Sequence, residues 1–547
     1  MSSYFSLTVK RQTVHLSPTQ SIGIEGGGNT TEMAGNDSCS GRPAVLSLSM
    51  SLDDAEDGAS AERDDESTAA STTKPSEFHA AEEIWLLLSL SFPSVAIQFS
   101  MFFLFPQAAS IVGRVLGTEE LAGFSLGSLV GNLTCLSIVV GTLSAADTLM
   151  PRAYGRGDYP EVGRLAIRSV AACAVLLLPP IIPLCTVVVR VLISIGQDST
   201  AAALASSWIP LYLIGVPANV IFRVIQRFLV AQHRPWPPVY ASVIPCVFVQ
   251  PGLLRVLIPR MGLQGSALAI ASTQWIMLLL LVLHLRCWPS YRPETWPGFS
   301  IAFVKEALSP VPFLEFLHLS FGGVLSLSEW WFWEAMCFVA GSFGMVELCA
   351  HTIAYNVIPL MFMIPLGTSI GLSVRIGNVL GDDPLKAKKI AAWTVFFIAI
   401  FGAIAAVGLW IFKYSVIGMF TSDPSVVEES LRIWGKVCYY IFNFYIFGIN
   451  CAILRSLGMQ WRLAAIIVVC LWMLLLPSVL WIAVRNGGGL EVQWTLLPLY
   501  YTLMQVFLIY SYVFHDWGNK MDPTFPPPNC QPECLNSPTE STMLLGA

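Results

Sequence analysis

Long runs of apolar residues recur along the chain after residue 80, and short polar segments separate them. A helix needs about 20 predominantly apolar residues to cross the hydrocarbon core of a bilayer. Twelve stretches meet this requirement. They predict spans at 84–105, 121–147, 166–190, 204–226, 237–258, 263–286, 314–341, 348–371, 390–411, 431–453, 463–484 and 494–514. The pattern predicts an all-α polytopic membrane protein.

Composition agrees with this class, because 54% of the 547 residues are hydrophobic and only 12% are charged. A soluble domain carries about 25% charged residues. The acidity is local: residues 1–80 hold 12 acidic and 5 basic residues, whereas the remainder holds 24 acidic and 25 basic residues. Such a polar, acidic segment is typical of disorder. We therefore expect a disordered tail at 1–80, six spans within 81–286, a connection at 287–312, six spans within 313–516 and a tail at 517–547.

Basic residues gather after the even-numbered stretches and are scarce after the odd-numbered ones. The clusters are Arg152, Arg156, Arg164 and Arg168, then Arg227 and Arg234, then Arg375, Lys386, Lys388 and Lys389, then Arg455 and Arg462. By the positive-inside rule these ends face the cytoplasm. The connection 287–312, both tails and both termini are then cytoplasmic.

The two halves resemble each other when the sequence is shifted by about 225 residues. The matching positions are Glu120 and Glu347, Trp236 and Trp461, and Gly262 and Gly487. Because each half has an even number of spans, the halves enter the membrane from the same side as parallel six-helix repeats. Transporters commonly have such repeats, with the substrate near the membrane midplane between them.

The seventh stretch contains the strongest candidate for chemistry. Residues 328–334 read Ser-Glu-Trp-Trp-Phe-Trp-Glu, so Glu329 and Glu334 lie within an apolar run. An ionised carboxylate at membrane depth costs about 2 to 4 kcal/mol, and such residues usually face a bundle interior or a cavity. A buried carboxyl can exchange a proton for a cationic ligand, and Trp330 and Trp333 offer cation–π surfaces. Because five residues turn about 140° on a helix, we expect one carboxyl to face a cavity while neighbours hold the other.

Several motifs resemble those of the multidrug and toxic compound extrusion (MATE) transporters. They are Glu120 to Gly155 with its Ala153-Tyr-Gly, Gln226-Arg-Phe-Leu-Val-Ala-Gln, Glu347-Leu-Cys-Ala-His-Thr-Ile-Ala-Tyr-Asn, Ser373-Val-Arg-Ile-Gly-Asn-Val-Leu-Gly, and the Glu-Trp-Trp-x-x-Glu beginning at Glu329. The last is similar to the seventh span of the eukaryotic branch. The resemblance covers about residues 82 to 516.

This resemblance implies an N-lobe and a C-lobe that work by alternating access, and export of organic cations and other amphiphiles in exchange for H⁺ or Na⁺. It places the coupling acids at Glu329 and Glu334, and polar N-lobe positions at Gln98 and Asn132. One departure is Phe444, at the position where the eukaryotic branch commonly carries an acid on the tenth span. Coupling would then depend on the seventh span alone.

Other polar residues within the spans are weaker candidates. Tyr355 and Asn356 end the C-lobe signature and are candidate site residues, whereas for Asp147 we expect a structural role with Arg152. No phosphate-binding Gly-rich loop with Lys-Ser or Lys-Thr occurs, which argues against ATP-driven pumping. We expect no catalytic residue, no metal site and no cofactor beyond the coupling ion, which is H⁺ with Na⁺ left open.

The leading interpretation is a proton-coupled antiporter for organic cations or amphiphilic drugs or metabolites. The alternatives are a flippase for a lipid-linked or amphiphilic substrate, and an intramembrane acyltransferase that uses His318 or His351. We expect the bilayer and a small molecule as partners, no nucleic acid, and a functional monomer. The acidic dileucine pattern Glu540-Ser-Thr-Met-Leu-Leu adds the vacuolar or endolysosomal membrane to the plasma membrane as a location.

Overall fold

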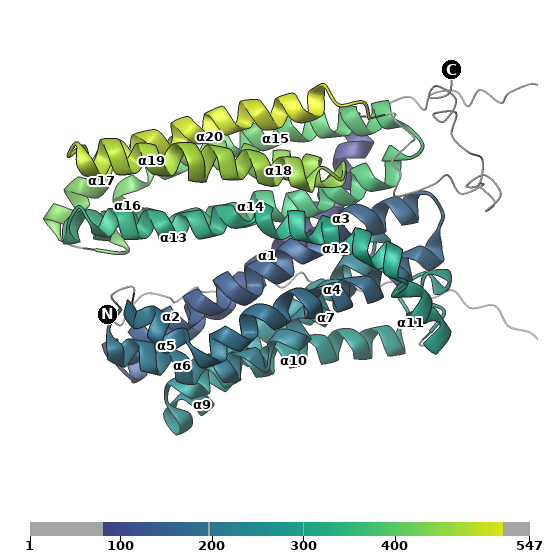
Figure 1. Ribbon diagram of the computed structural model, residues 1–547, viewed down its shortest axis with the longest axis horizontal. Helices are drawn as coiled ribbons and strands as arrows, with labels where there is room; N and C mark the ends of the chain where they lie inside the picture. Colours follow the sequence, from purple (N-terminus) through teal and green to yellow (C-terminus); the bar gives the residue numbers. More distant parts are fainter. Residues whose placement is uncertain (1–79, 195–196, 299, 422, 518–547) are drawn as a thin grey trace, which may run out of the picture. The chain divides into compact units, whose positions relative to one another are not determined.

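The computed structural model describes residues 80–194, 197–298, 300–421 and 423–517. All of these residues belong to one compact unit. The regular elements of this part are all helical, which confirms the predicted fold class (Figure 1). The predicted acidic tail and the dileucine pattern lie outside the described residues.

The first half of the described chain runs from α1 to α10. Its elements are α1 Ala80–Val115, α2 Thr118–Gly131, the π-helical η1 Asn132–Leu136, α3 Ser137–Gly155, α4 Tyr159–Thr186, α5 Val188–Ser194, α6 Ser199–Leu213, α7 Val216–Ala231, α8 Trp236–Ile244, η2 Pro245–Val249, α9 Gln250–Met261 and α10 Leu263–Cys287. The connection to the second half contains the 3-10 turn η3 Pro293–Thr295 and the short helix α11 Ile301–Ala307.

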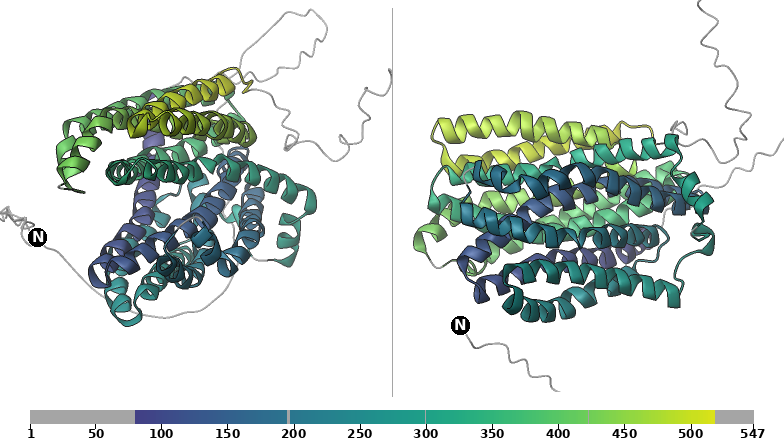
Figure 2. Two further views of the ribbon diagram at one scale, coloured as in Figure 1. Left: turned by 60° about the vertical axis from the view of Figure 1, so that its left-hand side comes forward. Right: turned by 60° about the horizontal axis from the view of Figure 1, so that its bottom comes forward.

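The second half runs from α12 to α20. Its elements are α12 Pro310–Ser326, α13 Ser328–Gly341, α14 Met345–Leu380, α15 Pro384–Ile411, α16 Lys413–Gly418, α17 Pro424–Ser456, α18 Gln460–Ile467, η4 Val468–Leu475, α19 Leu476–Ser478, η5 Val479–Arg485 and α20 Gly489–Val513. In Figure 1 the yellow-green helices late in the chain lie on one side and most of the blue helices on the other, while α1, in purple, packs along α14; Figure 2 gives two further views.

Eleven helical segments among the described residues are long and apolar enough to cross a membrane. The pair α6 and α7, which bend by 49° at their junction, makes a twelfth when counted as one span. The twelve predicted stretches are therefore confirmed. The seventh span differs from a single continuous helix. It breaks at Leu327 between α12 and α13.

Equivalent helices in the two halves begin with an aspartate as the N-cap residue. Asp158 and Asp383 begin the third and ninth spans, and each accepts a hydrogen bond from the backbone N–H three residues later. Asp198 and Asp423 also cap α6 and α17, with the backbone N–H groups of Ala201 and Ser425 as their donors. Each pair is separated by 225 residues, the shift that relates the two halves of the sequence. Such caps satisfy N–H groups that a helix start leaves without partners.

Each half packs around its own hydrophobic cluster. One cluster runs from Ile97 to Phe316, and the other, apart from Leu87, runs from Phe332 to Trp517.

The halves meet closely at the helix ends that carry the basic clusters. A Cβ added to Gly155 would lie 2.4 Å from the Asn378 carbonyl oxygen. Glu83 of α1 accepts two 2.7 Å hydrogen bonds from Arg375 of α14. Its Oε1 also forms an ion pair with Lys386 Nζ at 2.8 Å. These contacts join the two halves at this end. Figure 1 shows them diverging from α3 and α12 toward α2 and α13.

Candidate functional site

A cavity lies between the two halves, with about 1440 Å³ of empty space including the part open to solvent. Small-molecule sites usually combine an apolar wall with a few polar groups that converge on the ligand. This cavity has that character. Its wall includes Phe102, Phe105, Leu136, Phe362 and Met363, together with the polar side chains described below.

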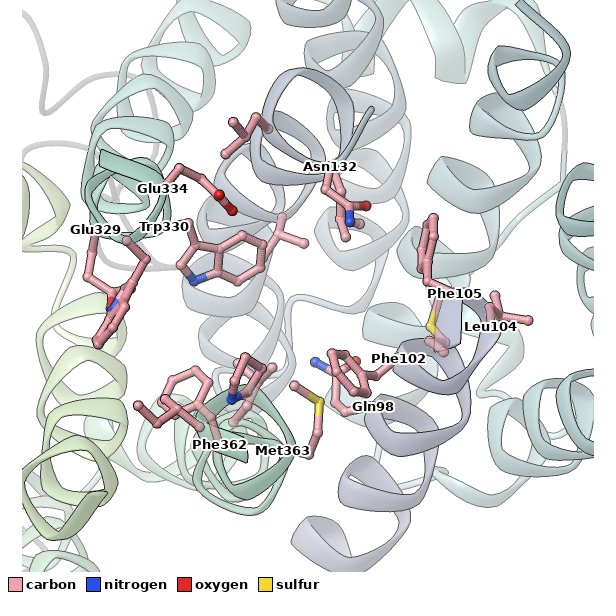
Figure 3. Close-up of a pocket in the computed structure, with 18 of the residues that line it drawn as sticks. Gln98, Phe102, Leu104, Phe105, Asn132, Glu329, Trp330, Glu334, Phe362 and Met363 are labelled. Carbon is pink, nitrogen blue, oxygen red and sulfur yellow. The ribbon is translucent and has the colours of Figure 1, made fainter. Parts of the chain in front are cut away.

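The break at Leu327 positions both glutamates of the seventh span. Glu329 lies in the first turn of α13, two residues after the break. Glu334 follows five residues later, and both carboxyls line the cavity. Figure 3 shows Glu329, Trp330 and Glu334 on one side of the cavity, with Asn132 and Phe105 opposite.

Glu329 is held by neutral donors. Its side chain is 2% exposed, and its Oε1 accepts hydrogen bonds from Tyr501 Oη at 2.8 Å and Trp333 Nε1 at 3.0 Å. Across the described ranges, no basic side chain lies within ion-pair distance of it. A second, smaller cavity also borders Glu329, and its wall includes Arg455 of α17. Glu329 therefore lies between two cavities.

Glu334 is half-buried and has a different neighbour. Its Oε1 accepts a 2.5 Å hydrogen bond from Tyr355 Oη of α14. No ion pair to this carboxyl occurs among the residues that the structure describes. The two glutamates thus have different partners. The expectation that one carboxyl faces the cavity while neighbours hold the other is wrong, because both line the cavity and both accept hydrogen bonds.

The structure places seven of the eight predicted site residues in the cavity wall: Gln98, Asn132, Glu329, Trp330, Trp333, Glu334 and Tyr355. Asn356 does not line the cavity, which corrects the prediction. It is exposed, and its Nδ2 donates to the Thr352 carbonyl at 2.8 Å. The reason is the helical rotation of about 100° per residue, which turns Asn356 away when Tyr355 faces inward.

Phe444 also lines the cavity, where it stacks on Phe362 with ring centroids 4.1 Å apart. The tenth span therefore contributes an aromatic surface to the cavity wall at this position. The candidate histidines lie outside the lining. His318 is exposed beside Trp461, and His351 is buried with its Nε2 3.4 Å from Cys337 Sγ.

Asp147 has a structural contact, but with a different partner from the one predicted. Its Oδ1 lies 2.9 Å from Arg227 Nε, and its Oδ2 accepts from Arg227 Nη2 at 3.4 Å. Arg152 instead donates across the halves to the Ser456 carbonyl. The sequence favoured Arg152 because it is near in the chain, whereas the pairing is made between α3 and α7.

Sequence reasoning missed a polar group in the first half of the cavity wall. The residues are Tyr212, Asn219, Arg223 and Gln274. A signal was present, because Arg223 is a charged residue inside the predicted span 204–226, the same feature that identified the glutamates.

Comparisons with known proteins agree with this architecture. The family model described as MatE matches residues 93–251 and 323–481, one segment in each half. Multidrug and toxin extrusion protein 1 of Danio rerio is 28% identical over 388 residues, covering 69% of this chain and 63% of that protein. The Homo sapiens protein of the same name is 30% identical over 350 residues, covering 63% of this chain and 60% of that protein. The chain thus spans somewhat under two thirds of the length of these relatives.

Solved structures show the same fold. The eukaryotic MATE transporter AtDTX14 superposes with a TM-score of 0.72 at 20% identity, over 80% of this chain and 97% of that one. The Vibrio cholerae MATE transporter VcmN in its bent form gives a TM-score of 0.66 at 16% identity, over 79% and 97%. The two family segments together cover more than half of the 547 residues, and they confirm the resemblance seen in the motifs. This integral membrane protein belongs to the MatE family.

Proposed function

We propose that the protein is a secondary active transporter that exports amphiphiles bearing a cationic group in exchange for H⁺. The observation that carries this proposal is the pair of glutamates in the wall of one cavity between two helical repeats. The family and the names of the relatives, which are multidrug and toxin extrusion proteins, support export of small molecules.

The coupling follows from how the carboxyls are held. Glu329 and Glu334 receive hydrogen bonds from hydroxyl and indole donors, and no basic side chain in the described part of the chain pairs with them. An unpaired charge in a low-dielectric cavity is costly, so each carboxyl is neutralised either by a proton or by a cation. A proton and a cationic substrate then compete for the same oxygens, which is the minimal requirement for antiport.

Protons suit this site better than Na⁺. Among the residues that the structure describes, no group of three His, Cys, Asp or Glu side chains is arranged to hold a metal ion. The neighbours of Glu329 Oε1 point hydrogen atoms at it rather than oxygen lone pairs. Na⁺ prefers several oxygen ligands, as hard cations do. The experiment below separates the two ions.

Alternating access requires the halves to separate at one end of the helices and to approach at the other. The contacts between Gly155 and Asn378, and between Glu83 and Arg375, close the end with the basic clusters. By the positive-inside rule this end is cytoplasmic, so the cavity faces outward in this state. One chain contains both halves and the whole cavity wall, which supports a functional monomer in the plasma membrane or an endolysosomal membrane.

The alternatives have weaker support. A flippase for a lipid-linked substrate would not need two carboxyls within the cavity. An acyltransferase would need a histidine at the substrate site, but His318 and His351 both lie outside the cavity wall.

The test is uptake of a rhodamine dye, an amphiphile with a delocalised cation, into proteoliposomes with an acidic lumen. Glu329→Gln and Glu334→Gln should each lower gradient-driven uptake by about tenfold or more, since a charged contact is worth at least that factor. Glu315→Gln is the matched control, because Glu315 is an exposed residue of the same span and does not line the cavity. Equal uptake driven by a Na⁺ gradient at uniform pH would refute proton coupling.

A further inference from the structure

The first half of the chain contributes a buried cation to the cavity wall. Arg223 of α7 is 6% exposed, lines the cavity, and donates from Nε to Asn219 Oδ1 at 2.7 Å. No carboxylate in the described ranges lies within ion-pair distance of its guanidinium. A charged side chain inside a membrane span is expensive and usually has a functional partner.

Three other arginines of this protein form ion pairs with carboxylates of the same chain. Arg227, one helical turn further along α7, pairs with Asp147 at 2.9 Å. Arg168 pairs with Glu161, and Arg375 with Glu83. Arg223 Nε donates to the neutral amide of Asn219, so no carboxylate of the described residues balances the charge of the guanidinium. A ligand can supply this missing negative charge.

The first half of the chain contributes further polar groups to the same cavity wall. The carboxamides of Asn132 and Gln274 line the wall, and the oxygen of each has no hydrogen-bond partner in the described part of the chain. Oxygen and nitrogen of a carboxamide are assigned from their partners, so either end can face a ligand. Guanidinium and amide N–H groups together form a suitable set of donors for a carboxylate.

The cavity wall therefore carries charged groups of both signs, which come from different halves of the chain. Arg223 belongs to the first half of the chain, and Glu329 and Glu334 belong to the second. Trp330 lies beside the two glutamates, while Phe105 lies on the opposite side near Asn132 (Figure 3). Such a wall matches a ligand with an anionic group at one end, an aromatic body, and a cationic group at the other.

We propose that Arg223 and Asn219 form an anion-binding subsite, and that the substrate is a zwitterionic amphiphile rather than a simple organic cation. Its carboxylate, or a similar monoanionic group, binds the Arg223 guanidinium, and its cationic group binds Glu329 or Glu334. A plain cation gains nothing at Arg223 and is repelled by it. This inference rests on the proposed function for the direction of transport, but the recognition of charge stands on the cavity alone.

The experiment uses two forms of one dye, a rhodamine with a free carboxylate and its methyl ester. They share the aromatic body and the delocalised cation and differ in the anionic group. Binding to purified protein is followed by quenching of tryptophan fluorescence, and uptake by proteoliposomes with an acidic lumen. The wild type should bind the free acid about tenfold tighter than the ester, or more, because a hydrogen bond to a charged group is worth at least this factor.

Two variants separate charge recognition from folding. Arg223→Met should lose the preference for the acid while still binding the ester, which shows that the cavity is intact. Arg223→Lys keeps the charge and should retain part of the preference, although it loses the planar fork.

The outcomes distinguish this inference from the proposed function. If the wild type binds the ester as tightly as the acid, binds neither form, or keeps its preference for the acid in Arg223→Met, the anion subsite is refuted. If the acid is preferred in binding but no pH gradient drives its uptake, the subsite stands and proton-coupled export fails.

Discussion

The close approach of the two halves at Gly155 provides a direct perturbation of the transport cycle. In Gly155→Ala, the new Cβ would lie 2.4 Å from the Asn378 carbonyl oxygen and 2.7 Å from its Cα, whereas ordinary contacts begin at 3.4 Å. The backbones of α3 and α14 would therefore have to separate by roughly 1 Å, as judged from these two distances. Overpacking of this kind costs about 1–3 kcal/mol.

The cost applies only to the state in which this end is closed, because the two backbones separate when it opens. The substitution should therefore shift the population toward the open state by about 5- to 150-fold. Hydrogen–deuterium exchange reports the change without added labels. Exchange should accelerate in residues 150–160 and 374–384, and not in 117–123 and 343–349 at the opposite ends of the helices.

Gly408→Ala is the matched control, because a Cβ at this helical position on α15 meets no atom within 4 Å. It should leave exchange at both ends unchanged. Equal exchange in Gly155→Ala and Gly408→Ala would refute the reasoning, because the contact that closes this end would then not depend on the glycine.

Three further substitutions test other contacts of the structure. Asp147→Asn removes the partner of the buried Arg227 and should lower the free energy of unfolding by about 3–5 kcal/mol, measured by thermal denaturation; a change within 1 kcal/mol would contradict the pairing. Burial, aided by a nearby arginine, lowers the pKa of His233, so the unfolded state binds more protons and stability should fall as the pH drops below about 6.5. His233→Gln should reduce this dependence of the melting temperature on pH. An unchanged dependence would count against the lowered pKa of His233. Tyr355→Phe removes the hydrogen bond to a cavity carboxyl and should weaken dye binding by about tenfold, whereas Asn356→Ala, outside the cavity, should not alter it; the reverse order would be inconsistent with the geometry.

Hydropathy was sufficient to predict the spans, because a bilayer imposes both length and composition on every crossing helix. The duplication was visible for a similar reason, since positions such as Gly262 and Gly487 have positive φ values of 60° and 72° that favour glycine in both halves. The break at Leu327 was not predictable. No proline or glycine marks it, and the apolar run continues through it.

The site was predicted in part. A carboxyl inside an apolar run is a strong signal, so Glu329 and Glu334 were identified, but their donors Tyr501 and Tyr355 come from other helices and depend on packing. Asn356 was misplaced because one step along the helix turns its side chain by about 100° from the direction of Tyr355. Arg223 is also a charge inside a predicted span, but its place in the cavity wall depends on how α7 packs against the other helices.

Antiport by this protein requires a proton and the substrate to compete for Glu329 and Glu334. Proton release on substrate binding tests it directly, by adding the zwitterionic rhodamine to purified protein in a weakly buffered solution and following the pH. Binding should release protons from the wild type, and release should be reduced in each single Glu→Gln variant and absent from the double variant. Saturable binding of the dye without any proton release from the wild type at any pH between 5 and 8 would contradict it.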